Sequence, residues 1–254
     1  MKHIFLTIFS LLFFAQANMA QSFDHKHLVW DSLLKKYVNG SGLVNYKGFK
    51  KDEDSLNQYL QSLSQVTEEN YSQFSKNQKL AFLINAYNAF TIRLILDHYP
   101  IKSIGDIGSP ISLLNLARGT PWKKEFFILL GKTRNLDWIE HQKLRKDFTE
   151  PRIHFAIVCA SLGCPILKMD SYKDTILESQ LLSAKLGFLK DTSKNSYDKD
   201  KNILRLSKIF DWFKEDFVKQ DTLIHFVQEG FSDPIKADTL IEYNDYSWKL
   251  NEQK

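Results

Sequence analysis

The residues of this sequence that could do chemistry lie close together near its middle. Its two cysteines, Cys159 and Cys164, follow two histidines, His141 and His154, and the acid Glu140 precedes all four. A thiol, an imidazole and a carboxyl group are the parts from which a nucleophilic hydrolase is assembled. The segment is therefore the first candidate for an active site.

The residues that lead to the cysteines have the composition of a buried strand. The run from Ile153 to Ala160 is apolar and β-branched, which predicts a strand. Side chains alternate along a strand, so Cys159 and His154 would lie on opposite faces. We therefore expect these two side chains not to pair.

Cys164 lies beyond the predicted strand, between Gly163 and Pro165. Because proline is favoured at the first position of a helix, Cys164 would stand at a helix N-cap. The positive end of a helix dipole lowers the pKa of a thiol and makes it more nucleophilic. Cys164 is therefore the predicted nucleophile.

Glu140 and His141 fall within a predicted capped helix from Asp137 to Phe148, and the spacing turns His141 toward the protein. Its imidazole is a candidate general base, as is that of His154, and the choice between them stays open. Simpler interpretations compete. Asp137 and Glu140 would form a capping box, and either histidine could be a core residue bonded to backbone.

Asn85 and Asn88 lie three residues apart within the most apolar predicted helix, Lys76 to His98. A buried amide without partners costs about 1 to 3 kcal/mol, so both should be hydrogen-bonded. They could tether a loop. They could also orient a catalytic imidazole or donate to an oxyanion, and so they join the candidate catalytic residues.

Three interpretations of the cysteine and histidine cluster remain open, in this order of preference. The first is a cysteine hydrolase or acyltransferase. The second is a structural disulfide between Cys159 and Cys164, although a stiff strand would hold the two Cα atoms apart. The third is a zinc site that includes His141 and His154, but its spacing matches none of the usual patterns. We predict neither a bound metal nor another cofactor.

The elements that must position these residues are mainly helices at first and strands later. Helical spacing covers Phe23–Val38, Asp54–Leu63, Lys76–His98, Ser171–Leu189 and Thr222–Glu229; strands are expected in a hairpin over Glu125–Leu136 and at Ile203–Leu206 and Thr239–Tyr243. Without strict alternation of strand and helix, this order favours an α+β fold. We expect a helical N-terminal half packed on a small, mainly antiparallel sheet.

The 254 residues are 43% hydrophobic and 25% charged, which is typical of a globular protein rather than a disordered or collagen-like one. The net charge of +4 includes no basic block, so we do not expect nucleic-acid binding. The expected partner is a small-molecule or peptide substrate. Nothing indicates the oligomeric state.

Residues 1–20 resemble a secretory signal peptide. Lys2 precedes an apolar run from Ile4 to Ala15, and cleavage after Ala17 or Ala20 would start the chain at Asn18 or Gln21. An uncleaved anchor is the second choice. We found no later apolar run near the roughly 20 residues that cross a bilayer. Residues 21–254 should form one globular domain that is secreted or periplasmic, with no membrane span after processing.

The motifs in these segments resemble the domain of unknown function 547 family. The resemblance rests on the blocks Pro151–Ala156 and Cys159–Pro165, on Asn85–Ala89 and on Glu140-His141 with Leu144-Arg145, and it covers roughly residues 42–217. It implies that Asn85, Asn88, His141, His154, Cys159 and Cys164 belong to one family signature. A relation to papain-like or transglutaminase-like folds is possible, although those families carry the cysteine on the leading helix.

We therefore expect a cysteine-dependent hydrolase or acyltransferase that acts on an amide or thioester, with Cys164 as nucleophile and a histidine as base. The alternative is a noncatalytic secreted binding or envelope-interaction domain in which the cysteine and histidine cluster is structural.

Overall fold

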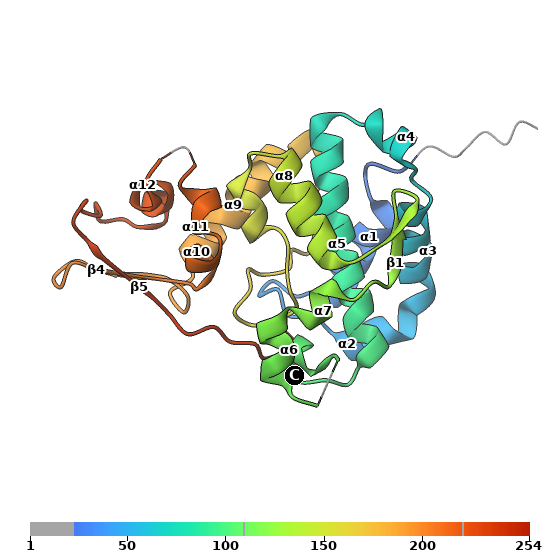
Figure 1. Cartoon of the computed structure of the whole chain (residues 1–254), viewed down its shortest axis with the longest axis horizontal. Helices are drawn as coiled ribbons and strands as arrows, with labels where there is room; N and C mark the ends of the chain where they lie inside the picture. The colour runs from blue at the N-terminus through green and yellow to red at the C-terminus, as the bar shows by residue number, and fades with distance from the viewer. Residues whose placement is uncertain (1–22, 109, 220) are drawn as a thin grey trace, which may run out of the picture.

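The computed structural model describes residues 23–108, 110–219 and 221–254, so the predicted signal peptide lies outside the described residues. Its first half is built from helices, as Figure 1 shows. These are α1 (Leu28–Tyr37), α2 (Tyr46–Phe49), η1 (Lys50–Asp52), α3 (Glu53–Ser64), α4 (Glu68–Ser72), α5 (Lys76–His98), η2 (Ile104–Asp106), α6 (Ser112–Arg118) and α7 (Thr120–Lys123). The helices α1, α3 and α5 confirm three of the predicted elements, and α5 has the predicted bounds.

Helix α5 is the centre of the larger hydrophobic core. Ser75 and Gln78 form a capping box at its start, and the helix ends at His98, before Pro100. By length and composition it could cross a bilayer, which differs from our expectation for the chain after residue 20. However, 89% of its most apolar stretch is buried inside the protein. A helix that is apolar on nearly every side needs such a central position.

The predicted hairpin is confirmed as β1 (Phe127–Leu129) and β2 (Lys132–Arg134), which pair antiparallel. It packs on the helical half, because the ring of Phe127 stacks on that of Phe90 with centroids 3.8 Å apart. The turn after β1 places Leu130 and Gly131 in the left-handed region. This hairpin leads directly into the segment that carries Glu140.

The second half contains short helices and a three-stranded sheet. Its elements are η3 (Trp138–Leu144), α8 (Arg145–Asp147), η4 (Pro151–Phe155), η5 (Asp174–Ile176), α9 (Leu177–Leu189), β3 (Ser196–Asp198), β4 (Ile203–Leu206), α10 (Ile209–Trp212), α11 (Lys214–Phe217), α12 (Leu223–Val227), η6 (Gln228–Gly230) and β5 (Leu240–Tyr243). Strand β4 lies between β3, its antiparallel neighbour, and β5, its parallel neighbour. The α+β class is confirmed.

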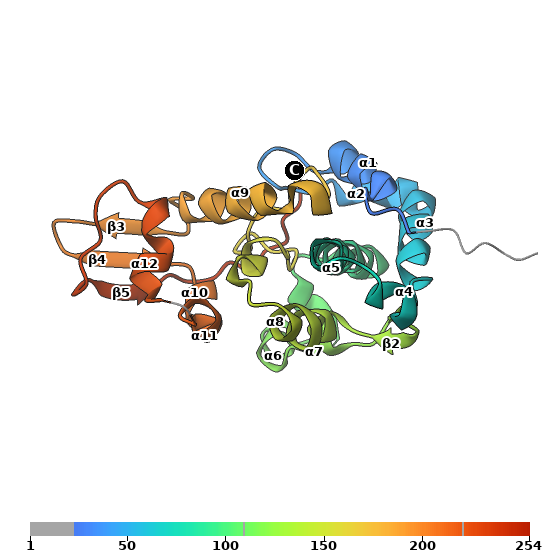
Figure 2. The same cartoon turned by 90° about the horizontal axis from the view of Figure 1, so that it is seen from above.

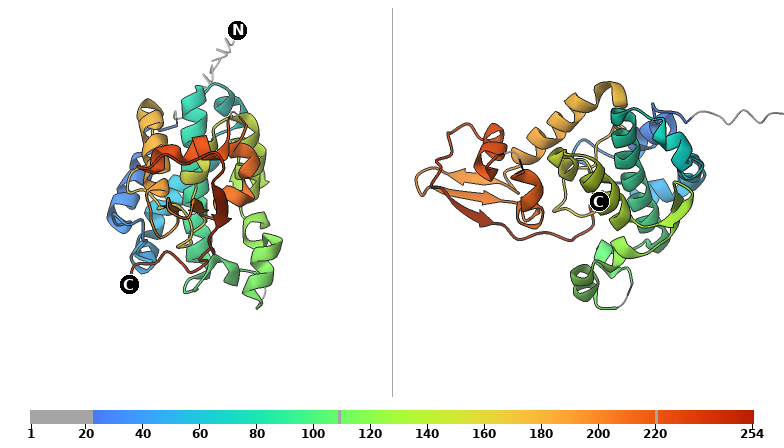
Figure 3. Two further views of the ribbon diagram at one scale, coloured as in Figure 1. Left: turned by 90° about the vertical axis from the view of Figure 1, so that its left-hand side faces the viewer. Right: turned by 45° about the horizontal axis from the view of Figure 1, so that its top comes forward.

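The sheet β3–β5 and helices α10–α12 form a lobe at one end of the molecule, and α9 runs from it toward the helical half (Figure 2). The lobe has its own hydrophobic cluster, centred on aromatic rings such as Phe210 and Phe217. After β5 the chain returns to the helical half (Figure 3), where Val44 bridges Glu252. This return segment brings the last aromatic residues to the candidate site.

Candidate active site

A cavity of about 350 Å³ lies between the helical half and the lobe. Among the residues that line it are Glu140, His141, His154, Cys159 and Cys164. They come from η3, from η4 and from the turn after η4. The structure thus brings together the residue types that the sequence singled out, and the volume lies at the small end of the usual range for small-molecule sites.

The segment before the cysteines is not a strand, so that prediction is wrong. Residues Pro151–Phe155 form the 3-10 helix η4, and Ile157 to Cys159 continue as irregular chain. Side-chain alternation does not apply to such a segment. His154 and Cys159 therefore both line the cavity instead of facing opposite ways.

The predicted helix N-cap at Cys164 is also wrong, because no helix follows it: Pro165 to Lys168 are irregular. Cys159 and Cys164 are joined by a disulfide, with their Cα atoms 6.3 Å apart. That separation is within the range of disulfides, and a turn rather than a stiff strand makes it possible. Of the three interpretations of the cluster, the disulfide is the one present here.

Cys164 Sγ is surrounded by hydrogen-bond donors of the protein. It accepts hydrogen bonds from the backbone N–H of Cys159 at 3.0 Å, from the Tyr246 hydroxyl at 3.1 Å and from the Ser161 hydroxyl at 3.5 Å. Such donors favour the charged form of an acceptor. They would stabilise a thiolate on Cys164, which is the effect that we expected from a helix dipole.

Tyr246 reaches the sulfurs from the C-terminal return segment. The backbone N–H groups of Leu162 and Gly163 donate to the carbonyls of Lys249 and Ser247, which fixes this segment against the cysteine turn. A Cβ at Gly163 would lie 2.8 Å from the Tyr246 ring, so the close approach requires glycine. Burial, with the nearby charge of Glu140, raises the pKa of Tyr246 and keeps its hydroxyl a donor.

Glu140 also lines the cavity and lies in the π-helical segment η3. The Tyr87 hydroxyl donates to its Oε2 at 3.4 Å. Burial raises the pKa of Glu140 to about 7, despite the opposing charge of Arg145. A carboxyl group with this pKa can both give and take a proton at neutral pH.

The capping box proposed for Asp137 and Glu140 is not formed. Asp137 makes no side-chain cap, and the Asn135 side chain accepts the N–H of Trp138 at 2.8 Å instead. Glu140 is therefore free of a capping role. π-helical turns are rare and frequent at functional sites, and this one carries both Glu140 and His141.

His141 is half-buried and held by two charged neighbours. Arg145 Nη1 donates to its Nδ1 at 2.8 Å, and Asp137 Oδ1 lies 3.6 Å from its Nε2. Burial and the cation Arg145 lower the pKa of His141, although Asp137 opposes them. Since a guanidinium can only donate, the neutral ring carries its proton on Nε2.

His154 is buried beneath the cavity. Its Nε2 bonds Asp216 Oδ2 at 2.8 Å, and its ring stacks on Phe213 with centroids 4.0 Å apart. Burial lowers the pKa of His154. Asp216 also accepts a hydrogen bond from Arg145. This one carboxylate from α11 therefore positions the His154 ring directly and the His141 ring through Arg145.

Asn85 and Asn88 are buried but do not line the cavity. The amide of Asn88 donates to the Ala156 carbonyl and accepts the N–H of Val158, both at 2.9 Å. Asn85 binds the backbone of Tyr172 in the same way. Their predicted catalytic use does not match this placement; Asn88 instead fixes the segment that leads to Cys159.

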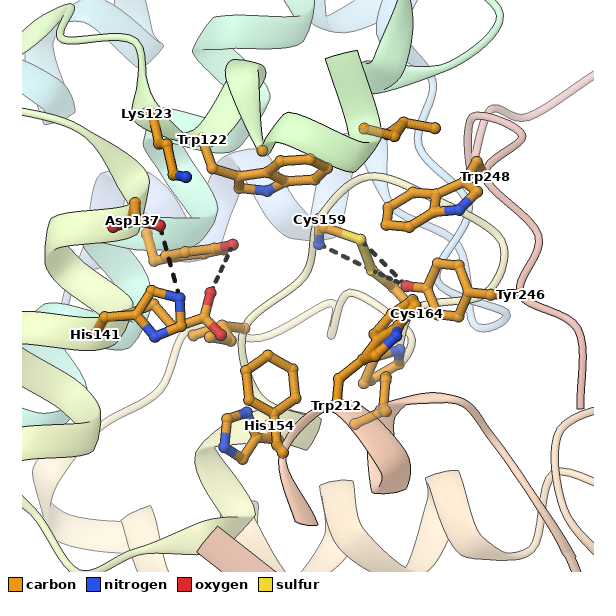
Figure 4. A pocket seen from close by; sticks show the side chains of 18 of the residues that line it. Trp122, Lys123, Asp137, His141, His154, Cys159, Cys164, Trp212, Tyr246 and Trp248 are labelled. Atoms are coloured by element: carbon orange, nitrogen blue, oxygen red, sulfur yellow. Dashed lines mark hydrogen bonds and ion pairs between the residues drawn. A yellow bond between two sulfur atoms is a disulfide. The ribbon is translucent and has the colours of Figure 1, made fainter. Parts of the chain in front are cut away.

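Aromatic rings line the cavity near the disulfide: Trp122, Trp212, Tyr246 and Trp248. The rings of Tyr246 and Trp248 have centroids 4.6 Å apart, and Trp212 lies within 5.7 Å of Trp248. Figure 4 shows the sulfurs beside Tyr246 on one side, with His141 and Asp137 on the other. The cavity thus has an aromatic sulfur side and a polar side.

The zinc interpretation finds no support in residues 23–108, 110–219 and 221–254. The two sulfurs are bonded to each other, and over these residues no group of three or more histidine, cysteine or acidic side chains is placed to hold a metal ion.

Fold and site together define an α+β protein with a pocket lined by a disulfide, two imidazoles and a carboxyl group of near-neutral pKa. Residues 71–189 match the model of the family described as Protein of unknown function, DUF547, in agreement with the resemblance in the sequence. This range is narrower than the residues over which the sequence resembles the family. It includes both cysteines but neither Asp216 nor Tyr246. No curated protein and no solved structure matches the chain. The papain-like or transglutaminase-like relation thus stays a prediction.

Proposed function

We propose that the protein is a cysteine-dependent hydrolase or acyltransferase for an amide or thioester, with Cys164 as nucleophile. One observation carries the proposal: the carboxyl group of Glu140, the imidazole of His141 and the sulfur of Cys164 line a single cavity. The three hydrogen bonds on Cys164 Sγ add support, because they would stabilise the attacking thiolate.

The disulfide has to be opened before this reaction. An external dithiol or phosphine supplies two electrons; with a dithiol, its thiolate displaces one protein sulfur and its second thiol then closes the reductant's own disulfide. Both Cys159 and Cys164 are left as thiols. The oxidised protein is then the inactive form.

In the reaction, the Cys164 thiolate attacks the carbonyl carbon and forms a carbon–sulfur bond. The bond to the amine or thiol breaks, and the leaving group takes the proton of the Glu140 carboxyl. Water or a second nucleophile then attacks the acyl-cysteine, Glu140 accepts its proton, and the thiolate leaves. A pKa of about 7 suits Glu140 for both steps.

Of the two histidines, His141 is the better candidate for direct participation. Its ring is partly exposed and lines the cavity, and Asp137 Oδ1 lies 3.6 Å from its Nε2. His154 has its Nε2 bonded to Asp216 and its ring covered by Phe213. We assign His154 a positioning role.

The alternative is a noncatalytic binding domain with a structural disulfide. The bonded sulfurs and the aromatic lining favour it.

We also propose that the chain is exported, since persistent disulfides belong mainly to oxidising compartments.

The two cysteine-to-serine variants test the proposal, because both lose the disulfide and differ only in the thiol that remains. The probe is the neutral thioester of phenylacetic acid with methyl thioglycolate, and phenylacetate release is measured by chromatography. We expect the wild type to hydrolyse it only after phosphine reduction. Cys159→Ser should do so without reductant, and Cys164→Ser should do so under neither condition. Activity in Cys164→Ser would show that Cys164 is not the nucleophile, and activity in none of the proteins would favour the binding domain.

A further inference from the structure

Two exposed cationic side chains line the cavity. They are Arg118 at the end of α6 and Lys123 at the end of α7. Within residues 23–108, 110–219 and 221–254, neither forms an ion pair within 4.0 Å, although many of the protein's other lysines and arginines do. They are therefore available to an anion.

Lys123 lies on the polar side of the cavity. Figure 4 places it beside Asp137 and His141, and its charge is one of those that lower the pKa of His141. The sulfurs lie on the other side, where Tyr246 contacts them at 3.1 and 3.3 Å. A ligand that spans the cavity would meet aromatic rings at one end and Lys123 at the other.

The charge of the lining sets the charge of the ligand. Arg118 and Lys123 bring two positive charges, and Asp137 brings one negative charge. Glu140 is neutral for part of the time near pH 7. The balance of between zero and one positive charge matches a carboxylate better than a doubly charged phosphate.

We propose that the substrate is an N-acyl amino acid or a short acyl-peptide, with an aromatic or apolar acyl group and a free carboxylate on the amine side. This proposal rests on the proposed function, because the orientation of the substrate in the cavity follows from the proposed reaction. The acyl group would pack on Trp212 and Trp248, the carbonyl carbon would face Cys164, the leaving nitrogen would face Glu140, and the carboxylate would bind Lys123.

Binding to the oxidised protein tests this substrate class without any reaction. The probes are N-phenylacetylglycine and its neutral amide, N-phenylacetylglycinamide, and binding is followed by tryptophan fluorescence. We expect the carboxylate to bind about tenfold more tightly, as one charged hydrogen bond implies. Lys123→Met should remove this preference and leave binding of the neutral amide unchanged.

Lys124→Met is the matched control. Lys124 is the next residue, is exposed, and lies 3.5 Å from His98 Nε2 instead of lining the cavity. It should keep the preference for the carboxylate. Equal binding of both probes, binding of neither, or equal effects of the two substitutions would overturn the proposal. Since the disulfide stays closed, these results are independent of whether Cys164 reacts, and a failure of one proposal is distinguishable from a failure of the other.

Discussion

The Glu140→Gln protein is expected to be more stable than the wild type at about pH 8, by about 3 kcal/mol, and of similar stability near pH 4. The folded protein raises the pKa of Glu140 from 4.5 to about 7, mainly by burial. Between these values the unfolded chain loses the proton first. The contribution of this group is therefore fully present below pH 4.5 and lost as pH rises through about 7. Glutamine stays neutral and can keep the contact with Tyr87.

Urea unfolding at the two pH values measures this difference. Glu125→Gln is the control, because Glu125 is exposed and outside the cavity, so its removal should leave the pH dependence of the wild type in place. If Glu140→Gln shows the same pH dependence as the wild type, Glu140 is not a buried acid of near-neutral pKa. A role in proton transfer would then lose its physical basis.

A second large effect is expected at the cysteines after reduction. Cys164 should react with iodoacetamide much faster than Cys159, with a pH midpoint below the roughly 8.5 of a free thiol, because three donors stabilise its thiolate. Tyr246→Phe removes one donor and should move that midpoint up by about one pH unit. Near pH 7 the rate would fall about tenfold.

Tyr87→Phe removes a hydroxyl from the same cavity without touching a sulfur, since Tyr87 bonds Glu140. It should leave the alkylation midpoint of Cys164 unchanged. Faster alkylation of Cys159, or equal shifts in the two variants, would show that the hydrogen bonds on Cys164 do not select it as the nucleophile. Peptide mapping by mass spectrometry separates the two sites.

Local signals in the sequence were enough to predict α5. The capping residues Ser75 and Gln78, the apolar run and Pro100 all lie within or beside the helix, so no distant contact is needed to define it. The hairpin β1–β2 was equally local, because its turn residue Gly131 can adopt a positive φ. Both elements are therefore defined by residues that lie close to them in the sequence.

The segment before the cysteines depends on a distant residue instead. Its apolar, β-branched residues were predicted to form a strand, but Asn88 takes the carbonyl of Ala156 and the N–H of Val158 that a neighbouring strand would otherwise pair. An amide 68 and 70 residues earlier in the chain cannot be recognised as that partner from the sequence. The error in this element then produced the errors about the faces of His154 and Cys159.

The residues that complete the site stand in no sequence pattern that marks them as functional. Tyr246 and Trp248 stand in an irregular C-terminal segment without periodicity, and Asp216 is one of three acids within the aromatic stretch 209–218. Their roles follow from the return of the chain to the helical half and from the contacts of α11 with α8 and η4. The types and clustering of Glu140, His141 and the cysteines were visible, but the geometry that joins them was not.

The most direct test of the central claim is to map the acyl group after a single turnover. The phosphine-reduced protein is mixed with the neutral phenylacetyl thioester, quenched with acid and digested, and the peptides are measured by mass spectrometry. We predict a phenylacetyl group on Cys164, absent from the oxidised protein and retained longer in Glu140→Gln, because Glu140 activates the water that removes it. An acyl group on Cys159 alone, or on neither cysteine, would contradict Cys164 as the nucleophile.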